Sequence, residues 1–274
     1  MQKARVIPFK HDDRPNPIGM STMSPAMADM NAYPEYLLNQ VRAHLGKTVW
    51  EIGVGNGQST RSLLAQGHSV WATDIAQECL DALSASISTE PQGLLARLHL
   101  LQIDLNRPET FHPLIDAGID SVLCFNVLEH IHEDVSALQG IRRVLPPSAN
   151  LSLIVPAHPR LFGRMDSEAG HFRRYSRNSL KAALTGAGWI VEGCRYVNAL
   201  GALGWWYHNR VRKSAGLADP HVNRQMRSAD RWLPKIARWT DPCLNGLIGL
   251  SLVALARPDR SQDHVHFQSS KGSK

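Results

Sequence analysis

The stretch VWEIGVGNGQST, from Val49 to Thr60, decides the fold that the sequence predicts. Its first residues belong to the run KTVWEI, from Lys47 to Ile52, whose β-branched and aromatic residues predict a strand. Alternate glycines from Gly53 to Gly57 follow, and a helical pattern begins at Ser59. Glycines let the backbone turn tightly and let a ligand approach without obstruction from a Cβ atom, and the first turn of a helix offers free N–H groups. We interpret the stretch as a strand–loop–helix unit that binds a ligand.

Beyond this unit, short β-branched runs alternate with helix-length segments. The predicted strands are Lys47–Ile52, Ser69–Asp74, Arg97–Ile103, Ile119–Phe125, Asn150–Val155, Trp189–Val197 and Leu250–Ala256. The predicted helices are Ser59–Ala65, Ala76–Ser86, Asp134–Val144 and Ser176–Thr185. Strands separated by helix-length segments imply parallel β-α-β units. The sequence therefore predicts an α/β fold with a doubly wound, Rossmann-like, mainly parallel sheet of about seven strands. One antiparallel strand is expected near the C-terminus.

Composition and strand pattern divide the chain into five parts. Prolines and glycines make residues 1–30 an irregular arm or lid. Residues 31–197 are expected to form the core, and residues 246–257 its last strand. The connection 198–245 is rich in Trp, Arg and Lys and is long enough to have a structure of its own, so we expect a helical cap. The polar residues 258–274 are expected to form a disordered tail.

Charge and cysteine content exclude several classes of protein. The chain of 274 residues has 30 Lys and Arg against 24 Asp and Glu, and its net charge of +6 is modest. No basic segment resembles a nucleic-acid-binding module, so nucleic acid is not an expected partner. The four cysteines are scattered without a CxxC pair, which argues against a cysteine zinc site and favours the cytoplasm. The longest apolar run, Gly246–Ala256, is shorter than the roughly 20 residues that a membrane span needs. The first residues, MQKARVIPFKHDD, are basic but have no apolar stretch behind them, so we expect no secretory signal here.

The glycine loop distinguishes between two kinds of cofactor. The dinucleotide fingerprint G-x-G-x-x-G requires a third glycine at position 58, where this chain has Gln58. The loop is G-x-G-x-G instead, and an acid, Glu51, lies two residues before its first glycine. At the end of the next predicted strand, Asp74 stands where a carboxylate accepts both hydroxyls of an adenosine ribose. This combination resembles motif I of class I S-adenosylmethionine-dependent methyltransferases, in which the loop holds the amino-acid end of the cofactor.

Further motifs resemble the same family, in its order and at its spacing. QIDL, at 102–105, matches the acidic position that usually faces the adenine amine, and FNVLEHI, at 125–131, resembles a stretch of methyltransferases similar to those of ubiquinone biosynthesis. The resemblance implies S-adenosylmethionine as cofactor and S-adenosylhomocysteine as product. It also implies Tyr33 on a lid over the cofactor, although a core-facing tyrosine is the alternative. The implied cofactor-binding residues are Tyr33, Glu51, Gly53, Gly55, Asn56, Gly57, Asp74, Ile75, Asp104, Leu105 and Asn126.

A second distinctive stretch, from Val155 to Tyr175, follows the fifth predicted strand. Its pattern V-P-A…L-F-G…D…G-H-x-R-R-Y resembles a bacterial subset of these methyltransferases, whose members often look linked to carbohydrate, lipid-linked sugar or secondary-metabolite pathways. The stretch lies at the carboxyl edge of the predicted sheet, where doubly wound folds bind ligands. We therefore expect a small-molecule or lipid-linked methyl acceptor to bind there.

Several side chains of this region suit work on an acceptor. A hydroxyl must lose its proton to a base, for which histidine is the usual candidate. We rank His171 first, then His130 and His158, and include Tyr175 as a catalytic candidate. The expected acceptor contacts are His158, Asp166, Arg173, Arg174, Trp205 and Trp206. The alternatives stay open: the arginines hold an anionic acceptor or pair with Asp166 or Glu168, and Tyr175 contacts the acceptor or simply packs before a helix.

Two further patterns each allow more than one interpretation. Glu129, His130, His132 and Glu133 lie close in sequence, but no compact third ligand stands out, so we predict no catalytic metal. Trp205, Trp206 and Tyr207 precede Arg210, Arg212 and Lys213. They either lie at a membrane interface, as a peripheral contact, or pack as a helical cap over the acceptor pocket, which we favour.

These patterns together predict methyl transfer from S-adenosylmethionine to a secondary metabolite, a sugar or a lipid-linked molecule. We favour O-methylation with a histidine base, on the analogy with the N-V-L-E-H relatives and on the available histidines. Two alternatives remain: an enzyme that uses the bound sulfonium to assist a non-methylating reaction, and a non-catalytic subunit that binds the cofactor and activates a partner.

Overall fold

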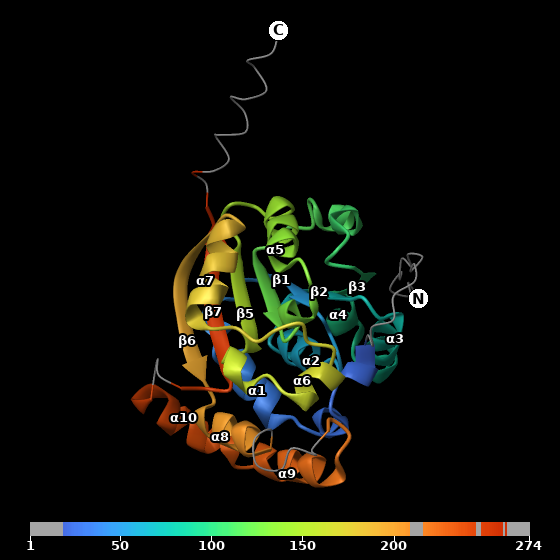
Figure 1. The fold of residues 1–274 in the computed structure, drawn as a ribbon. Coiled ribbons are helices and arrows are strands. Elements are labelled where there is room, and N and C mark those ends of the chain that lie inside the picture. The colour runs from blue at the N-terminus through green and yellow to red at the C-terminus, as the bar shows by residue number, and fades with distance from the viewer. Residues whose placement is uncertain (1–18, 209–215, 245–247, 260, 262–274) are drawn as a thin grey trace.

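The computed structural model describes residues 19–208, 216–244, 248–259 and 261. Its strands form one sheet in the order β3-β2-β1-β4-β5-β7-β6 (Figure 1). They are β1 (Thr48–Ile52), β2 (Ser69–Asp74), β3 (Leu98–Gln102), β4 (Ser121–Phe125), β5 (Asn150–Pro156), β6 (Trp189–Val197) and β7 (Ser251–Pro258). The first five run parallel, and β7 is antiparallel to both β5 and β6. The predicted doubly wound fold with one antiparallel strand is therefore confirmed.

Helices pack on both faces of this sheet (Figure 1). They are α1 (Ala32–Asn39), α2 (Gln58–Ala65), α3 (Gln77–Ser86), α4 (Gln92–Leu95), α5 (Asp134–Arg143), α6 (Arg164–Glu168), α7 (Arg177–Gly186), α8 (Ala199–Tyr207), α9 (Pro220–Asp230) and α10 (Leu233–Cys243). Side chains of α5 and α7 bury one large apolar cluster against the sheet, and side chains of α1, α2 and α3 bury another. Each large apolar side chain buried in this way contributes about 1.5–3 kcal/mol to folding.

The strand order places a crevice at one edge of the sheet. The chain leaves β1 toward β2 on one side, whereas β4 and β5 lie on the other side. Open α/β sheets bind ligands at this point of reversal, outside the carboxyl ends of the strands. The loops after the five parallel strands all open at this edge because those strands share one direction.

The cap helices α8, α9 and α10 lie together at one end of the molecule, next to α1 (Figure 1). The carboxylate of Asp230 in α9 accepts hydrogen bonds from the N–H groups of Asn31, Ala32 and Tyr33, at 3.1, 3.1 and 2.7 Å. The amide oxygen of Asn223 accepts from the Ser24 hydroxyl, at 2.6 Å. The described part of the arm, two 3-10 turns at Gly19–Thr22 and Pro25–Ala28, is thus joined to the cap.

Some sequence predictions concern residues outside the described part. These are the first 18 residues of the arm, the basic residues Arg210, Arg212 and Lys213, and most of the tail after Pro258. Among the described helices, none combines the length and the apolar character that a membrane crossing requires.

Candidate functional site

A cavity of about 460 Å³ lies between the carboxyl edge of the sheet, the arm and the cap. Its size is in the range of small-molecule sites. The loops after β1, β2, β3 and β4 form part of its wall, and further parts come from the arm, the start of α1, α6, the segment after α6, α8 and α9. The cavity therefore occupies the crevice that the strand order creates.

The loop after β1 has a backbone conformation that favours glycine. The φ angle is +78° at Gly53, +49° at Gly55 and +70° at Gly57, values at which an L side chain is strained. A Cβ atom on Gly53 would lie 2.3 Å from Cγ2 of Val127. The loop therefore presents bare backbone to the cavity at Gly53 and Gly55.

Two buried carboxylates flank this loop. Glu51, in β1, accepts a hydrogen bond from the Thr60 hydroxyl at 2.5 Å, and burial raises its pKa to about 8. Asp74, the last residue of β2, accepts from the N–H groups of Gly55 and Ala76 at 3.2 and 2.9 Å. Burial raises the pKa of Asp74 although these hydrogen bonds oppose the shift. A cation or a hydroxyl donor bound beside either side chain favours its charged form.

The next two loops complete this side of the cavity. Asp104, after β3, is almost fully buried, and its Oδ1 accepts from the backbone and side-chain nitrogens of Asn106 at 2.9 and 2.8 Å. Asn126, after β4, has a positive φ of +51°. Ile75 and Leu105 also line the cavity, so the residues that follow β1, β2, β3 and β4 converge there.

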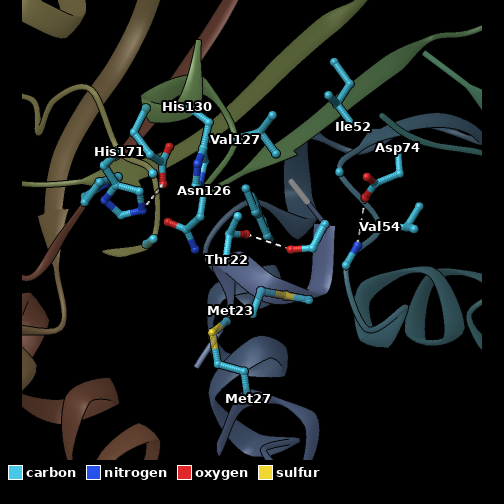
Figure 2. A pocket seen from close by; sticks show the side chains of 18 of the residues that line it. Thr22, Met23, Met27, Ile52, Val54, Asp74, Asn126, Val127, His130 and His171 are labelled. Atoms are coloured by element: carbon cyan, nitrogen blue, oxygen red, sulfur yellow. Dashed lines mark hydrogen bonds and ion pairs between the residues drawn. The ribbon is translucent and has the colours of Figure 1, made fainter. Parts of the chain in front are cut away.

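The arm covers the glycine loop from the cap side. Met23 and Met27 line the cavity, and Figure 2 shows their side chains between the arm and the ends of the strands. The side-chain amide of Gln58 donates to the carbonyl oxygens of Met27 and Met30, at 2.8 and 2.6 Å. Tyr33 also lines the cavity. Gln58, which stands where a dinucleotide fingerprint would have its third glycine, therefore holds the arm against the loop.

Three further side chains meet at the cavity wall: Glu129, His130 and His171. Each has a ligand atom within 4.8 Å of those of the other two. Burial raises the pKa of Glu129 to about 7 and lowers the pKa of His130 to about 4. The two imidazole rings meet edge to face with centroids 4.7 Å apart, and Figure 2 shows them on the same side of the cavity as Asn126. His171 thus joins Glu129 and His130 as a third member of this cluster, which spacing along the chain did not indicate.

Contacts behind His171 fix its orientation. The N–H of Phe172 donates to the carbonyl oxygen of Glu129 at 2.8 Å, which joins the two loops. Asp166 in α6 is fully buried and accepts from Nδ1 of His171 at 2.9 Å and from Nε of Arg174 at 2.7 Å. Because a carboxylate only accepts, Nδ1 carries the proton and Nε2 is left on the cavity side. Burial raises the pKa of Asp166, but His171 and Arg174 lower it overall.

The family follows from a comparison with protein families. Residues 50–153, from β1 to β5, match the model of the methyltransferase domain family. This span contains the glycine loop, Asp74, Asp104 and Glu129. The chain thus contains a class I S-adenosylmethionine-dependent methyltransferase domain. Its cofactor is therefore S-adenosylmethionine.

Solved structures share the fold of this methyltransferase at low sequence identity. A chain from the complex of the Haloferax volcanii Trm112 methyltransferase activator with a methyltransferase is 17% identical, with a TM-score of 0.57, over 86% of this chain and 93% of that chain. A sarcosine dimethylglycine methyltransferase from Galdieria sulphuraria is 12% identical, with a TM-score of 0.56, over 89% and 93%. The cyclase SpnF is 16% identical, with a TM-score of 0.54, over 84% and 80%. These likenesses concern the fold alone. No curated protein sequence matches significantly.

Several predicted site residues of the methyltransferase do not line the cavity. They are Gly57, His158, Asp166, Arg173, Tyr175 and Trp206. Tyr175 is buried, and its hydroxyl donates to Oδ2 of Asp134 at 2.7 Å, a contact that agrees with the alternative in which Tyr175 packs before α7. Arg173 pairs with the same carboxylate at 3.0 Å, so it is not placed to hold an acceptor either. Both side chains anchor the loop to the start of α5.

The other residues outside the cavity have structural surroundings of their own. His158 stacks on Tyr196, with ring centroids 4.7 Å apart. Gly57 precedes α2, with a Cβ position 2.6 Å from Leu83. Trp206 is 50% exposed, whereas Trp205 lines the cavity beneath the Arg174 guanidinium, 4.5 Å from its ring centroid. Asp166 stands behind His171 and Arg174. Of the residues predicted to contact the acceptor, Trp205 and Arg174 therefore line the cavity, whereas His158, Asp166 and Trp206 do not.

Sequence reasoning missed part of the wall of the cavity. Met23, Met27 and Met30 in the arm, and Val222 and Met226 in α9, all line it. The spacing of the three arm methionines is the one signal in the sequence that indicates a shared face. Nothing local to α9 indicates that it packs on the arm, because that contact joins residues about two hundred positions apart.

Proposed function

We propose that this methyltransferase transfers a methyl group to a hydroxyl oxygen of a small-molecule acceptor, with His171 as the base. The Asp166–His171 hydrogen bond of 2.9 Å carries the proposal. It commits Nδ1 of the imidazole to a buried carboxylate, so Nε2 is the nitrogen that can take a proton from an acceptor in the cavity. A carboxylate behind the ring also stabilises the imidazolium that forms.

The glycine-loop half of the cavity suits the cofactor. Bare backbone at Gly53 and Gly55 permits close approach, and the buried carboxylates of Glu51 and Asp74 suit a ligand with a cationic end and ribose hydroxyls. When bound, S-adenosylmethionine supplies a methyl group on a sulfonium centre. The residues proposed to hold it are Tyr33, Glu51, Gly53, Gly55, Asn56, Asp74, Ile75, Asp104, Leu105 and Asn126, all of which line the cavity.

The cap half of the cavity suits the acceptor. Trp205, Val222 and Met226 make this wall mostly apolar, which fits a secondary metabolite or the reacting end of a lipid-linked molecule. Arg174 is committed to Asp166 and to the Ala157 carbonyl oxygen, so the proposed acceptor needs no anionic group. We keep peripheral membrane contact through the exposed Trp206 as the alternative for a lipid-linked acceptor.

Positioning completes the proposed mechanism. The arm and the cap form two walls of the cavity, and the bound cofactor and acceptor displace water from between them, which strengthens the interactions of the charged groups inside. His171 is held from behind by Asp166, which keeps its Nε2 oriented toward the acceptor. A nucleophile held in this geometry gains much of its rate advantage from proximity. The free thiols Cys79, Cys124 and Cys194 suit a reducing compartment, so we propose a cytoplasmic location.

The test begins with the cofactor and ends with the product. Calorimetry with S-adenosylmethionine and S-adenosylhomocysteine should show binding that Asp74→Ala weakens. Incubation with panels of phenols, sugars and amines should then give an O-methylated product, identified by mass spectrometry and NMR. Unchanged cofactor affinity in Asp74→Ala contradicts the proposed ribose contact, and methylation of nitrogen alone contradicts the proposed acceptor class.

A further inference from the structure

We propose that Glu129, His130 and His171 bind a divalent transition-metal ion at the cavity wall. The three side chains provide one carboxylate and two imidazoles, with one ligand atom from each within 4.8 Å of the others. All three line the cavity, so an ion bound there is accessible to an acceptor. The sequence alone predicts no metal here, because His171 lies about forty positions after Glu129 and His130.

The surroundings of Glu129 are the first reason. Its side chain is fully buried, and within the described part of the chain neither carboxylate oxygen has a hydrogen bond. The Nε2 atom of His171 lies 4.0 Å from its Oε1, beyond hydrogen-bond distance. Buried polar groups are nearly always hydrogen-bonded, and a buried carboxylate without a partner is costly. A cation held between Glu129 and the two imidazoles would remove this cost.

The orientation of the histidines is the second reason. Nδ1 of His171 is bonded to the buried carboxylate of Asp166 at 2.9 Å, and the ring of His130 meets that of His171 edge to face, with centroids 4.7 Å apart. A histidine that binds a metal almost always uses its other ring nitrogen in such a bond to a carboxylate or a carbonyl group. His171 therefore has one nitrogen fixed from behind and one available to an ion, beside the ring of His130.

The ligand set indicates the class of ion. Imidazole suits Zn²⁺, Fe²⁺, Co²⁺ and Ni²⁺, whereas Mg²⁺ and Ca²⁺ prefer oxygen ligands alone. Two histidines and one carboxylate are the protein ligands of several catalytic zinc sites, in which a further position stays open for water or substrate. Bonds of about 2.0–2.2 Å require the three side chains to draw slightly closer than they stand. We therefore expect Zn²⁺ and Co²⁺ to bind and Mg²⁺ to bind weakly.

The chemical role of the ion rests on one part of the proposed function, the O-methylation of an acceptor, and replaces the other part, His171 as the base. An acceptor hydroxyl that occupies the open position of the ion becomes more acidic. Its O–H bond then breaks and the proton passes to water, which leaves the oxygen held on the ion as the nucleophile. In the ion-bound protein Nε2 of His171 is a ligand and cannot be the base. The two proposals thus give His171 different roles, which an experiment can separate.

The neighbouring residues provide a matched control. His132 and Glu133 are the same residue types and directly follow the cluster in sequence, and their side chains pair at 2.8 Å. That pair is mostly exposed, at 70% and 76%, so water can solvate it. An ion that binds merely to exposed histidine and glutamate would be lost from His132→Ala and not from a variant of the buried cluster.

The experiment uses the full chain, stripped with a chelator and then titrated with CoCl₂ or ZnCl₂ without cofactor or acceptor. Calorimetry and the visible absorption of Co²⁺ report stoichiometry and ligand geometry. We expect one ion per chain, and at least about tenfold weaker binding in Glu129→Gln and in His171→Asn. We expect His132→Ala to bind as the wild type does. Far-ultraviolet circular dichroism and retained S-adenosylhomocysteine binding show whether each variant is folded. If Glu129→Gln does not fold, the metal affinity of His171→Asn decides the test.

Each other outcome overturns one proposal. Wild-type protein that binds no Co²⁺, or cluster variants that bind it unchanged, would sink the metal site. If the wild type retains full methyl transfer in the presence of chelator and His171→Ala loses it, His171 is the base and the ion has no role in the reaction. If the cluster binds Co²⁺ but the enzyme methylates only nitrogen, the metal site is supported and the proposed acceptor class is wrong.

Discussion

The two halves of the cavity are built in different ways. The glycine-loop half comprises residues 51–56, 74–75 and 104–105, which lie at or just after the carboxyl ends of three successive strands. The histidine half comprises Glu129, His130, His171 and their supports Asp166 and Arg174, which lie on three separate segments. The first depends on local backbone geometry, and the second on side chains that meet after folding. The predictions below test whether the halves are separable.

The largest effect is expected in the histidine half. His171→Ala should lower single-turnover methyl transfer by about 10²–10⁴-fold, the usual contribution of a general base. Cofactor affinity should stay within about twofold of the wild type, because the glycine-loop half is unchanged. Rapid-quench assays and calorimetry measure the two quantities. His158→Ala is the control, since His158 stacks on Tyr196 outside the cavity. An equal loss of cofactor affinity in His171→Ala would show that the halves are coupled.

Gly53→Ala should disturb the glycine-loop half. The new Cβ would be 2.3 Å from Val127 at a φ of +78°, which costs about 1–3 kcal/mol in backbone strain alone. If the loop must adopt this strained conformation to bind the cofactor, a cost of about 1–3 kcal/mol corresponds to roughly 5–150-fold weaker affinity for the cofactor. Gly93→Ala is the matched control, because a Cβ at Gly93 has no neighbour within 4 Å among the described residues. If both variants bind S-adenosylhomocysteine like the wild type, the backbone argument for this half is wrong.

Glu51 provides a test by pH. Burial raises its pKa from 4.5 to about 8; Thr60 and Arg61 lower the pKa and Asp74 raises it. A raised pKa means that the folded protein holds a proton that the unfolded chain has released. The resulting stability is complete below about pH 4.5 and is lost as the pH rises through about 8.

Glu51→Gln should remove this dependence while its amide still accepts from Thr60. Between about pH 5 and pH 8 the unfolding free energy of the wild type should fall relative to that of Glu51→Gln, by at most about 1.4 kcal/mol per pH unit. Urea unfolding of both proteins across that range measures the difference. Parallel curves would mean that Glu51 is already charged in the folded protein.

The smallest effect is expected at the outer face of the cap. Trp206 is half exposed, so Trp206→Ala should change the unfolding free energy by less than about 0.5 kcal/mol and leave turnover of a soluble acceptor unchanged. Trp205→Ala should instead raise KM for the acceptor, because Trp205 lines the cavity. Sedimentation of the wild type and Trp206→Ala with anionic vesicles tests the alternative membrane contact. Equal loss of turnover in the two variants would contradict the division of the cap into inner and outer faces.

The features predicted from sequence are those with local causes. Strands β2 and β6 coincide with the predicted Ser69–Asp74 and Trp189–Val197, because β-branched runs and turn residues act within a few positions. The positive φ angles at Gly53 and Gly55 follow from residue type. The destinations of Tyr175 and Arg173 were not predictable, since both depend on Asp134. That carboxylate lies in a helix some forty positions earlier in the chain.

By itself the sequence determined the sheet, the glycine loop and the class of cofactor. The spacing of Glu51, the glycines and Asp74 sets backbone geometry that needs no distant partner. The tertiary structure alone decided that His171 reaches Glu129, through the Phe172 N–H and the Glu129 carbonyl oxygen at 2.8 Å. It also decided that the arm joins α9, through the Ser24 hydroxyl and the Asn223 amide oxygen at 2.6 Å. Contacts of this kind depend on how loops pack over a finished sheet, and spacing along the chain contains no record of that packing.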